Sequence, residues 1–111
     1  MNKSDTLYIE QMQDALEKIR SFTVGMSEDE FDGDQKTQSA VIMQLLILGE
    51  LTKKLSDETK EKVDLAWRHI AGFRDYAAHD YFDVDLSIVW TTVQNNIPEM
   101  QEKLDMFASG S

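Results

Sequence analysis

The chain has 111 residues but no cysteine, one proline and only five glycines. The lack of cysteine excludes disulfides, thiolate zinc sites and a cysteine nucleophile. The scarcity of glycine and proline argues against a turn-rich β-sandwich or barrel. No apolar run can span a bilayer, because the longest, residues 40–49, is interrupted by Gln44 and is far shorter than the roughly 20 residues required. The first ten residues also lack a stretch resembling a signal peptide, so we expect a single soluble domain in the cytoplasm, without membrane contact.

Acidic residues outnumber basic ones by 21 to 11, which gives a net charge of −10. Such a chain should not adhere indiscriminately to nucleic acid, because each phosphate contact needs a local cation. The charge is unevenly distributed, since residues 53–74 hold six lysines and arginines against four acids. An anionic ligand is therefore expected to bind to this segment.

Apolar residues recur at helical spacing along nearly the whole chain, which predicts an all-α protein. We expect an antiparallel bundle of four long helices and one short helix, formed by a single domain over residues 1–108. The first helix is expected to begin at Ser4 or Asp5, and the last to bend or restart near Pro98. Residues 109–111 resemble a vector-derived remnant or a disordered tail. The expected elements cover residues 4–25, 27–32, 35–55, 56–78 and 85–107.

Two adjacent residues interrupt the apolar pattern of the expected central helix at residues 35–55. Gly49 lies inside this helix, where glycine costs roughly 1 kcal/mol relative to alanine. Such a glycine usually permits the close approach of a neighbouring helix, and we predict that role here. Glu50 follows it and is predicted to be a solvated surface acid rather than a site residue.

The residues best suited to chemistry lie near the end of the third expected helix, where Arg74 and His79 are five positions apart. Histidine titrates near neutral pH and can exchange a proton with a hydroxyl or a leaving oxygen. Arginine stays cationic and can bind a phosphate with two donors. Together, the two side chains could support cleavage of RNA by attack of the RNA's own 2′-hydroxyl, without a metal ion. On one continuous helix, five positions separate the two side chains by about 140° and about 7.5 Å. Either the helix ends between them or a second copy of the chain completes the site.

A structural interpretation of the same segment remains open. His79 could simply close the helix, while Tyr81 and Phe82 anchor the following loop in the core. His69 is expected at the surface or at an interface. The acidic residues near His79 are expected to cap helices or to hydrate a loop rather than to bind a metal ion. They are Asp80, Asp83 and Asp85.

Several segments of the chain together form a recognisable pattern. They are Trp67-Arg68-His69-Ile70-Ala71-Gly72-Phe73-Arg74, His79-Asp80-Tyr81-Phe82, Val84-Asp85, Ile88-Val89-Trp90, Gly49-Glu50 and Asn96-Ile97-Pro98-Glu99. With these segments the chain resembles the HepT-like family of HEPN-domain proteins, most densely between Gly49 and Pro98 and over nearly its whole length. The resemblance implies an all-helical HEPN fold, a homodimer, and a metal-independent endoribonuclease that acts as the toxin of a toxin–antitoxin pair.

The resemblance also implies roles for individual residues. Arg74 would neutralise the scissile phosphate, and His79 would act as general acid or base while the 2′-hydroxyl attacks, leaving a cyclic phosphate and a free 5′-hydroxyl. Asp75 would orient one of these two side chains. Tyr81 would accept AMP from an MntA-like minimal nucleotidyltransferase, the antitoxin, and the added charge would repel RNA. The implied substrate is RNA rather than DNA, with transfer RNA as a candidate class, and no cofactor is implied.

A second function is compatible with the same fold: a non-catalytic helical dimer that binds and delivers substrate to a nucleotidyltransferase. Convergence of Arg74 and His79 with their two-fold mates around an open cleft would favour the ribonuclease, whereas burial of His79 would favour the binding module. Because the chain is acidic, RNA binding is expected to be weak, salt-sensitive and confined to the cleft.

Overall fold

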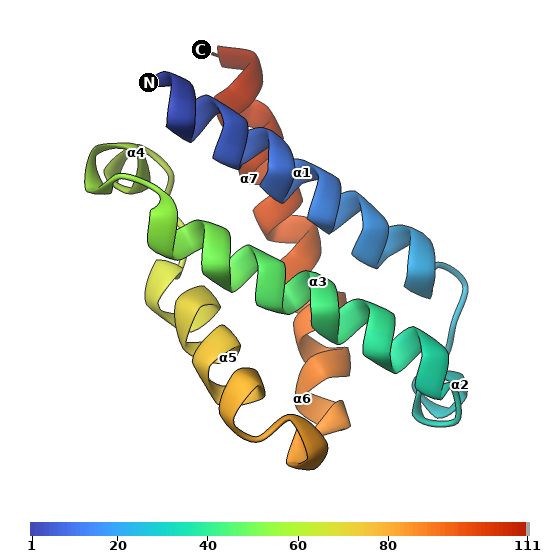
Figure 1. Cartoon of the computed structure of the whole chain (residues 1–111). Coiled ribbons are helices and arrows are strands. Elements are labelled where there is room, and N and C mark those ends of the chain that lie inside the picture. Colours follow the sequence, from blue (N-terminus) through green and yellow to red (C-terminus); the bar gives the residue numbers. More distant parts are fainter. Residues whose placement is uncertain (111) are drawn as a thin grey trace.

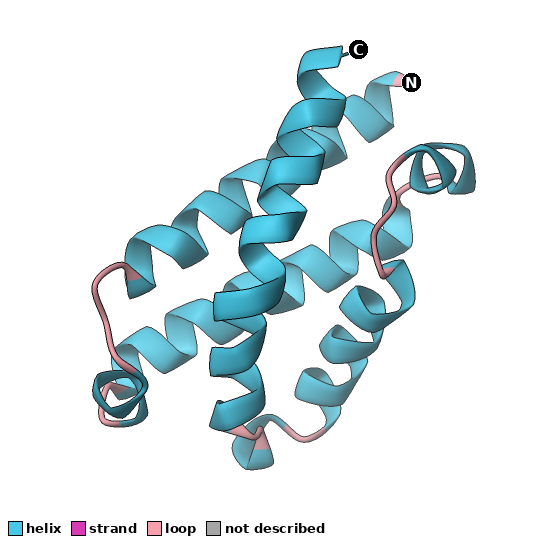
Figure 2. Cartoon of the chain, turned by 180° about the vertical axis from the view of Figure 1, so that it is seen from behind, coloured by secondary structure: helices cyan, strands magenta, loops and turns pink. Residues whose placement is uncertain are grey.

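Helices follow one another along residues 1–110, the part of the chain that the computed structural model describes (Figures 1 and 2). No strand occurs within this range, which confirms the all-α class. Helix α7 extends through Ser109 and Gly110 of the expected tail, and Ser111 lies outside the described residues. The elements are α1 (Lys3–Thr23), α2 (Glu28–Asp32), α3 (Gln35–Lys54), α4 (Asp57–Lys62), α5 (Trp67–His79), a 3₁₀ turn (Tyr81–Asp83), α6 (Leu86–Thr91), a π-helical turn (Thr92–Asn96) and α7 (Ile97–Gly110).

Helix α1 begins earlier than predicted. Its N-cap is Asn2, whose Oδ1 accepts a hydrogen bond from the backbone N–H of Asp5 at 2.6 Å, so the prediction of a cap at Ser4 or Asp5 was wrong. The Asp5 side chain is buried instead, and it accepts hydrogen bonds from the Ser56 N–H at 3.2 Å and the Thr59 hydroxyl at 2.6 Å. Burial opposes ionisation of Asp5, but the hydrogen bond from the Ser56 hydroxyl, together with those from the Thr59 hydroxyl and the Ser56 N–H, outweighs it and lowers the pKa of Asp5. A buried carboxylate thus ties the start of α1 to α4.

The single helix predicted over residues 56–78 is in fact two helices, α4 and α5. Ser56 caps α4 as expected, but the backbone becomes extended at Val63, whose side chain is buried. The indole of Trp67, at the start of α5, donates to the backbone carbonyls of Lys60 and Val63, both at 3.1 Å. Each carbonyl also accepts a backbone N–H, from Val63 at 3.3 Å and from Leu65 at 2.9 Å, so the indole is a second donor that ties the start of α5 to the end of α4. The apolar spacing continues across the break because both helices face the same core, so spacing alone could not show it.

The last part of the chain is one bent rod made of α6, the π-helical turn and α7 (Figure 2). Asp85 caps α6, and α7 restarts just before Pro98, which confirms both predictions. Proline is tolerated here because the first turn of a helix does not need its missing N–H. Ile88 fits the apolar spacing of the helix expected over residues 85–107, yet 49% of its surface is exposed because it faces a groove beside α5. Residues that do reach the core are Val89, Val93, Ile97, Met100 and Leu104.

The central helix α3 lies between α1 and α5 and packs against both (Figure 1). Gly49 is the point of closest approach to α5. A Cβ atom placed there would lie 2.2 Å from the Cβ of Arg74 and 3.0 Å from the backbone oxygen of Ile70. No side chain fits in that space, so the predicted role of Gly49 in close helix packing is confirmed. None of the helices within residues 1–110 is long and apolar enough to cross a membrane.

Candidate functional site

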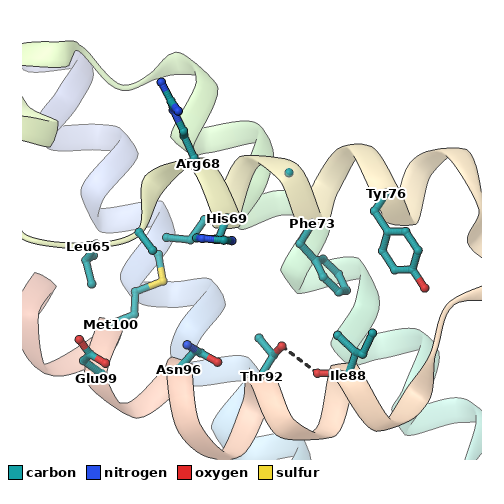
Figure 3. A pocket seen from close by; sticks show the side chains of 13 residues that line it. Leu65, Arg68, His69, Phe73, Tyr76, Ile88, Thr92, Asn96, Glu99 and Met100 are labelled. Carbon is teal, nitrogen blue, oxygen red and sulfur yellow. Dashed lines mark hydrogen bonds between the residues drawn. The ribbon is translucent and has the colours of Figure 1, made fainter.

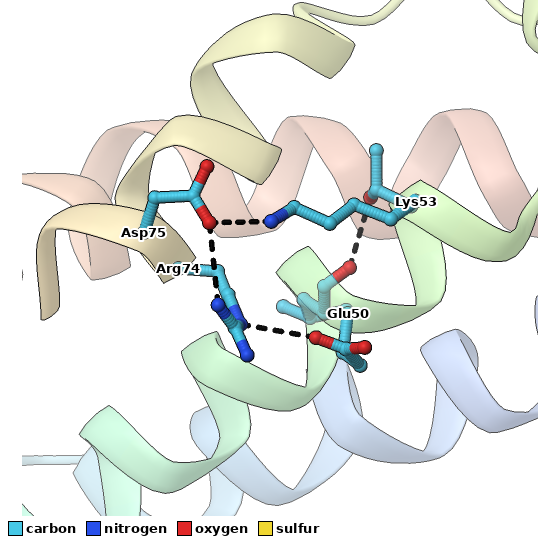
Figure 4. A network of polar contacts seen from close by, with 6 residues as sticks. Glu50, Lys53, Arg74 and Asp75 are labelled. Carbon is cyan, nitrogen blue, oxygen red and sulfur yellow. Dashed lines mark hydrogen bonds and ion pairs between the residues drawn. The ribbon is translucent and has the colours of Figure 1, made fainter. Parts of the chain in front are cut away.

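Arg74 lies on the side of α5 that packs against α3, where it belongs to a network of four charged residues (Figure 4). Its Nε donates to the Glu50 carboxylate at 3.0 Å, and its Nη1 lies 3.3 Å from Oδ1 of Asp75. The same Asp75 oxygen accepts a hydrogen bond from Lys53 of α3. We call these four residues the ion-pair network. Its two positive and two negative charges offset one another, and its geometry follows from the close approach that Gly49 permits.

Asp75 is predicted to orient a catalytic side chain, and its contacts are with cations. The hydrogen bond from Lys53, together with the positive charges of Lys53 and Arg74, lowers the pKa of Asp75 below its ordinary value. Asp75 is therefore a carboxylate at neutral pH. Within the described chain it contacts Arg74 and not His79.

Glu50 is a member of the ion-pair network that the sequence analysis missed. It was predicted to be a solvated surface acid, but its carboxylate binds the Nε of Arg74. The signal that could have identified it is its neighbour: a mid-helix glycine that admits another helix also places the next residue beside that helix. Glu50 and Lys53 lie one turn apart on α3, and both reach α5 from there.

His79 is the last residue of α5, and its side chain is exposed. Within residues 1–110 it makes no side-chain hydrogen bond or ion pair. Because α5 is continuous from Trp67 to His79, the possibility that the helix ends between Arg74 and His79 is wrong. Their side chains leave the helix about 140° apart, with Arg74 turned towards α3. One copy of the chain does not bring the two together.

Tyr81 and Phe82 do not anchor the loop after α5 in the core, so that structural alternative is wrong. Tyr81 is 42% exposed and Phe82 is 98% exposed, and their rings pack edge to face with centroids 5.6 Å apart. Tyr81 is therefore a surface residue, two positions beyond His79. An almost fully exposed phenylalanine next to it is uncommon on a protein surface.

The sequence profile described as ribonuclease HepT-like matches residues 12–107. The chain belongs to this family. A relative named "Probable ribonuclease HepT" from Thermococcus cleftensis is 37% identical over 106 residues, which cover 95% of this chain and 96% of the relative. A "Putative RNase" from Caldanaerobacter subterraneus is 33% identical over 92% of both chains. No solved structure matches the chain significantly. The profile match and the two relatives confirm the resemblance to the HepT-like family.

A third relative shows the same domain within a longer protein. It comes from Methanocaldococcus jannaschii and is named "Gamma-glutamylcyclotransferase and putative RNase". It is 33% identical over 94% of this chain, yet the match spans only 47% of the relative. The HepT-like unit can therefore occur as about half of a larger polypeptide.

Among the aspartates that follow α5 in this HepT-like chain, Asp85 caps α6. Asp85 accepts hydrogen bonds from the N–H groups of Ser87 at 2.9 Å and Ile88 at 3.4 Å, as expected of a helix cap. Across residues 1–110, no three histidine, cysteine or acidic side chains lie close enough together to hold a metal ion.

A groove of about 620 Å³ separates α5 from the rod of α6, the π-helical turn and α7 (Figure 3). His69, Phe73 and Tyr76 line it from α5, while Asn96 and Ile88 line it from the opposite side. The sequence analysis missed this groove because its walls come from segments whose separation depends on how the helices cross. The HepT-like domain thus presents two distinct surfaces along α5.

Proposed function

We propose that this HepT-like protein is an endoribonuclease that cleaves RNA without a metal ion, at a site completed by two copies of the chain. The observation that carries the proposal is the exposed His79 at the end of an unbroken helix whose Arg74 points elsewhere. In a family of ribonucleases, an accessible proton carrier and a fixed cation are the groups that this chemistry needs. A two-fold arrangement can place Arg74 of one protomer beside His79 of its partner.

The reaction begins when His79 removes the proton from a ribose 2′-hydroxyl. The 2′-oxygen forms a bond to the adjacent phosphorus, and the bond from phosphorus to the 5′-oxygen breaks. The leaving oxygen takes a proton from the imidazolium that has formed on His79 or from water, so the products are a 2′,3′-cyclic phosphate and a 5′-hydroxyl end. His79 can serve in either transfer because histidine both accepts and donates protons near neutral pH.

Arg74 stabilises the charge that develops on the phosphate oxygens. Its bonds to Glu50 and Asp75 use Nε and one Nη1 hydrogen, which leaves three N–H donors for the phosphate. The bonds already made hold the guanidinium in one orientation, so little reorganisation is needed when the phosphate arrives. In this role Asp75 and Glu50 position the arginine rather than contact the RNA.

Regulation is proposed to occur at Tyr81, within a toxin–antitoxin pair. An MntA-like nucleotidyltransferase would transfer AMP from ATP to the phenolic oxygen and release pyrophosphate. The exposure of Tyr81 supports this assignment, because a buried hydroxyl could not enter another active site. The added phosphate would place a negative charge two residues from His79 and repel the RNA backbone.

The proposal is tested by incubating the protein with total RNA and with transfer RNA in chelator, then labelling new 5′-hydroxyl ends with polynucleotide kinase. The parent protein should produce such ends, and His79→Ala should reduce the rate by roughly 100-fold or more. Gln11→Ala, which changes an exposed residue of α1, serves as the matched control for purification and folding.

Cleavage by both the parent and His79→Ala would contradict the assignment of His79 and indicate a contaminant. Intact mass spectrometry is needed before an inactive parent is interpreted, because an added AMP on Tyr81 would silence the enzyme. An inactive protein of unmodified mass would favour the alternative function, a non-catalytic dimer that delivers substrate to a nucleotidyltransferase.

A further inference from the structure

The groove between α5 and the C-terminal rod has the dimensions of a ligand site. Its volume of about 620 Å³ lies within the range of roughly 300–1,000 Å³ that is usual for small-molecule sites. Apolar side chains of Phe73, Ile70 and Met100 line it, and a smaller cavity of about 50 Å³ shares these three residues. The space between α5 and α7 is therefore not filled by the chain itself.

Polar groups are distributed around this apolar floor. Asn96, at the end of the π-helical turn, is exposed and makes no side-chain hydrogen bond within residues 1–110, so its amide offers both donors and an acceptor. The Tyr76 hydroxyl accepts a bond from the Asp85 N–H at 3.0 Å and retains its own proton for donation. The rings of Phe73 and Tyr76 lie 5.9 Å apart, edge to face, along one wall. Aromatic walls with an unpaired amide are suited to a nucleobase, which needs both stacking and edge recognition.

A cation lies at one end of the groove. Arg68 lines it there and forms no ion pair within the described residues, and the imidazole of His69 lies beside it. Arg68 stands at the rim, its side chain directed away from the C-terminal rod (Figure 3). The one acid in the lining, Glu99, is bound by Lys103 at 3.0 Å, so its charge is largely offset. On a chain of net charge −10, an arginine without an acidic partner is a favourable place for a phosphate.

The groove and His79 lie along the same side of α5. Arg68, Gly72 and His79 are separated by four and seven positions, spacings that bring residues to one face of a helix. Gly72 lies between Arg68 and His79 on this face and contributes no side chain. Apart from the neighbouring backbone of α5, nothing in the described chain lies within 4 Å of the position that a Cβ atom would take there. A nucleic acid strand leaving His79 can therefore run over Gly72 towards Arg68, a distance of about 16 Å along the helix axis.

We propose that this groove binds one unpaired nucleoside of the RNA strand, with Asn96 contacting the base edge and Arg68 the adjacent phosphate. The proposal rests on the endoribonuclease function and specifies its substrate as single-stranded RNA at the cleavage site. A nucleoside fits better than a second copy of the chain, because the lining pairs unused polar groups with an unpaired cation. The exposed part of α6 adds only Ile88 as a large apolar side chain.

The test fills the groove without touching the catalytic groups. In a His79→Ala background, which prevents cleavage, binding of a fluorescein-labelled single-stranded RNA is measured by anisotropy. Gly72→Leu should weaken binding at least 10-fold because the added side chain occupies the path over α5, and Gly72→Ala should give a smaller loss of about 2-fold. Thr91→Leu adds the same side chain to an exposed position of α6 outside the groove and is the matched control.

A second measurement reports on the groove alone. Addition of each of the four nucleoside monophosphates should shift the side-chain amide resonance of Asn96 in NMR spectra, and Gly72→Leu should abolish the shift. Asn96→Ala should also change the preference among homopolymeric RNAs while the rate of cleavage of a favoured RNA falls less than 10-fold.

The outcomes separate this inference from the proposed function. If Gly72→Leu binds and cleaves RNA as the parent does, the groove inference is overturned and the ribonuclease remains. If mononucleotides bind the groove but no RNA is cleaved, the groove is supported and the ribonuclease assignment fails. A change from dimer to monomer in Gly72→Leu, with mononucleotide shifts absent, would identify a second copy as the occupant and overturn the inference.

Discussion

On the side of α5 that faces α3, Arg74 and Asp75 are both paired, with Glu50 and Lys53 as their partners. On the side that faces the groove, Arg68 has no such partner within residues 1–110. The first side is held by direct helix contact at a glycine, and the second borders an open space of about 620 Å³. Helix α5 thus carries two different arginines. Arg74 is held by ion pairs, whereas Arg68 has no ionic partner within residues 1–110.

The difference between Arg74 and Arg68 gives a small acidic protein two kinds of contact with an anionic substrate. A fixed cation suits transition-state stabilisation, since its donors are already oriented where charge develops. A free cation suits binding, since it can follow a flexible strand. Substitutions on the two sides of α5 should therefore change different kinetic constants.

The largest effect is expected from the two arginines. Arg74→Ala should lower kcat about 100-fold or more, because in the proposed reaction it removes the cation that stabilises the developing charge on the phosphate. Arg68→Ala should mainly raise KM, because it removes a contact made equally in the ground state and the transition state. Single-turnover and steady-state cleavage of one RNA measure both constants. Arg20→Ala on α1, whose guanidinium donates to the Gln101 side chain at 2.6 Å, is the matched control. Equal losses of kcat in both variants would remove the distinction between the two sides.

Substitutions of Gly49 on α3 and of Gly72 on α5 test the packing on the two sides of α5. Gly49→Ala should destabilise the fold by about 1–3 kcal/mol, because its Cβ would lie 2.2 Å from that of Arg74. Gly72→Ala should stabilise it by up to about 1 kcal/mol, because its Cβ meets open space and alanine favours the helix. Urea unfolding of both variants measures the two free energies. Effects of the same sign would contradict the close approach of α3 and α5.

Glu50→Gln should lower kcat about 10-fold with KM nearly unchanged, because Arg74 loses the carboxylate that orients it. The free energy of unfolding should change little, since both residues are about half exposed. In an Arg74→Ala background the same substitution should have no further effect, which a purely structural role would not predict. Glu58→Gln, which alters an exposed pair with Lys62, is the control. Additive losses in the double variant would exclude a positioning role.

The sequence predicted features that depend on local spacing. The all-α class, the cap at Asp85 and the restart before Pro98 followed from residues within one or two helical turns. The divergence of Arg74 and His79 followed from helix geometry once α5 was known to be continuous. Such features are set by the backbone within a single element.

The features that were missed depend on how helices cross. The break between α4 and α5 was hidden because Val63 and Trp67 continue the apolar spacing across it. Glu50 was misjudged because its partner lies 24 positions away on another helix. The groove was not foreseen because Ile88 fits an apolar stripe yet faces a space between elements. In each case the sequence specifies the residue, and tertiary packing decides what it contacts.

The smallest expected effect concerns pH and again separates the two sides of α5. The pKa of Asp75 is lowered in the folded state, chiefly by its hydrogen bond from Lys53, so its pairing stabilises the protein above the unfolded value of about 3.9. That stabilisation is lost as the pH falls through the lower, folded-state pKa. The urea midpoint of the parent should therefore exceed that of Asp75→Asn at pH 6, and the gap should narrow below about pH 4.

Lys53 is the partner on which this gap depends. In a Lys53→Gln background the change in urea midpoint caused by Asp75→Asn should become nearly independent of pH, because the largest cause of the lowered pKa is absent. Lys54→Gln changes the adjacent exposed lysine, which forms no ion pair within residues 1–110, and should leave the gap as it is in the parent. A gap that stays constant from pH 6 to pH 2 in the parent would show that Asp75 is not ion-paired in solution. Arg74 would then keep Glu50 as its one partner within residues 1–110. The side of α5 that faces α3 would come to resemble the side that faces the groove, where Arg68 has no ionic partner within the same range.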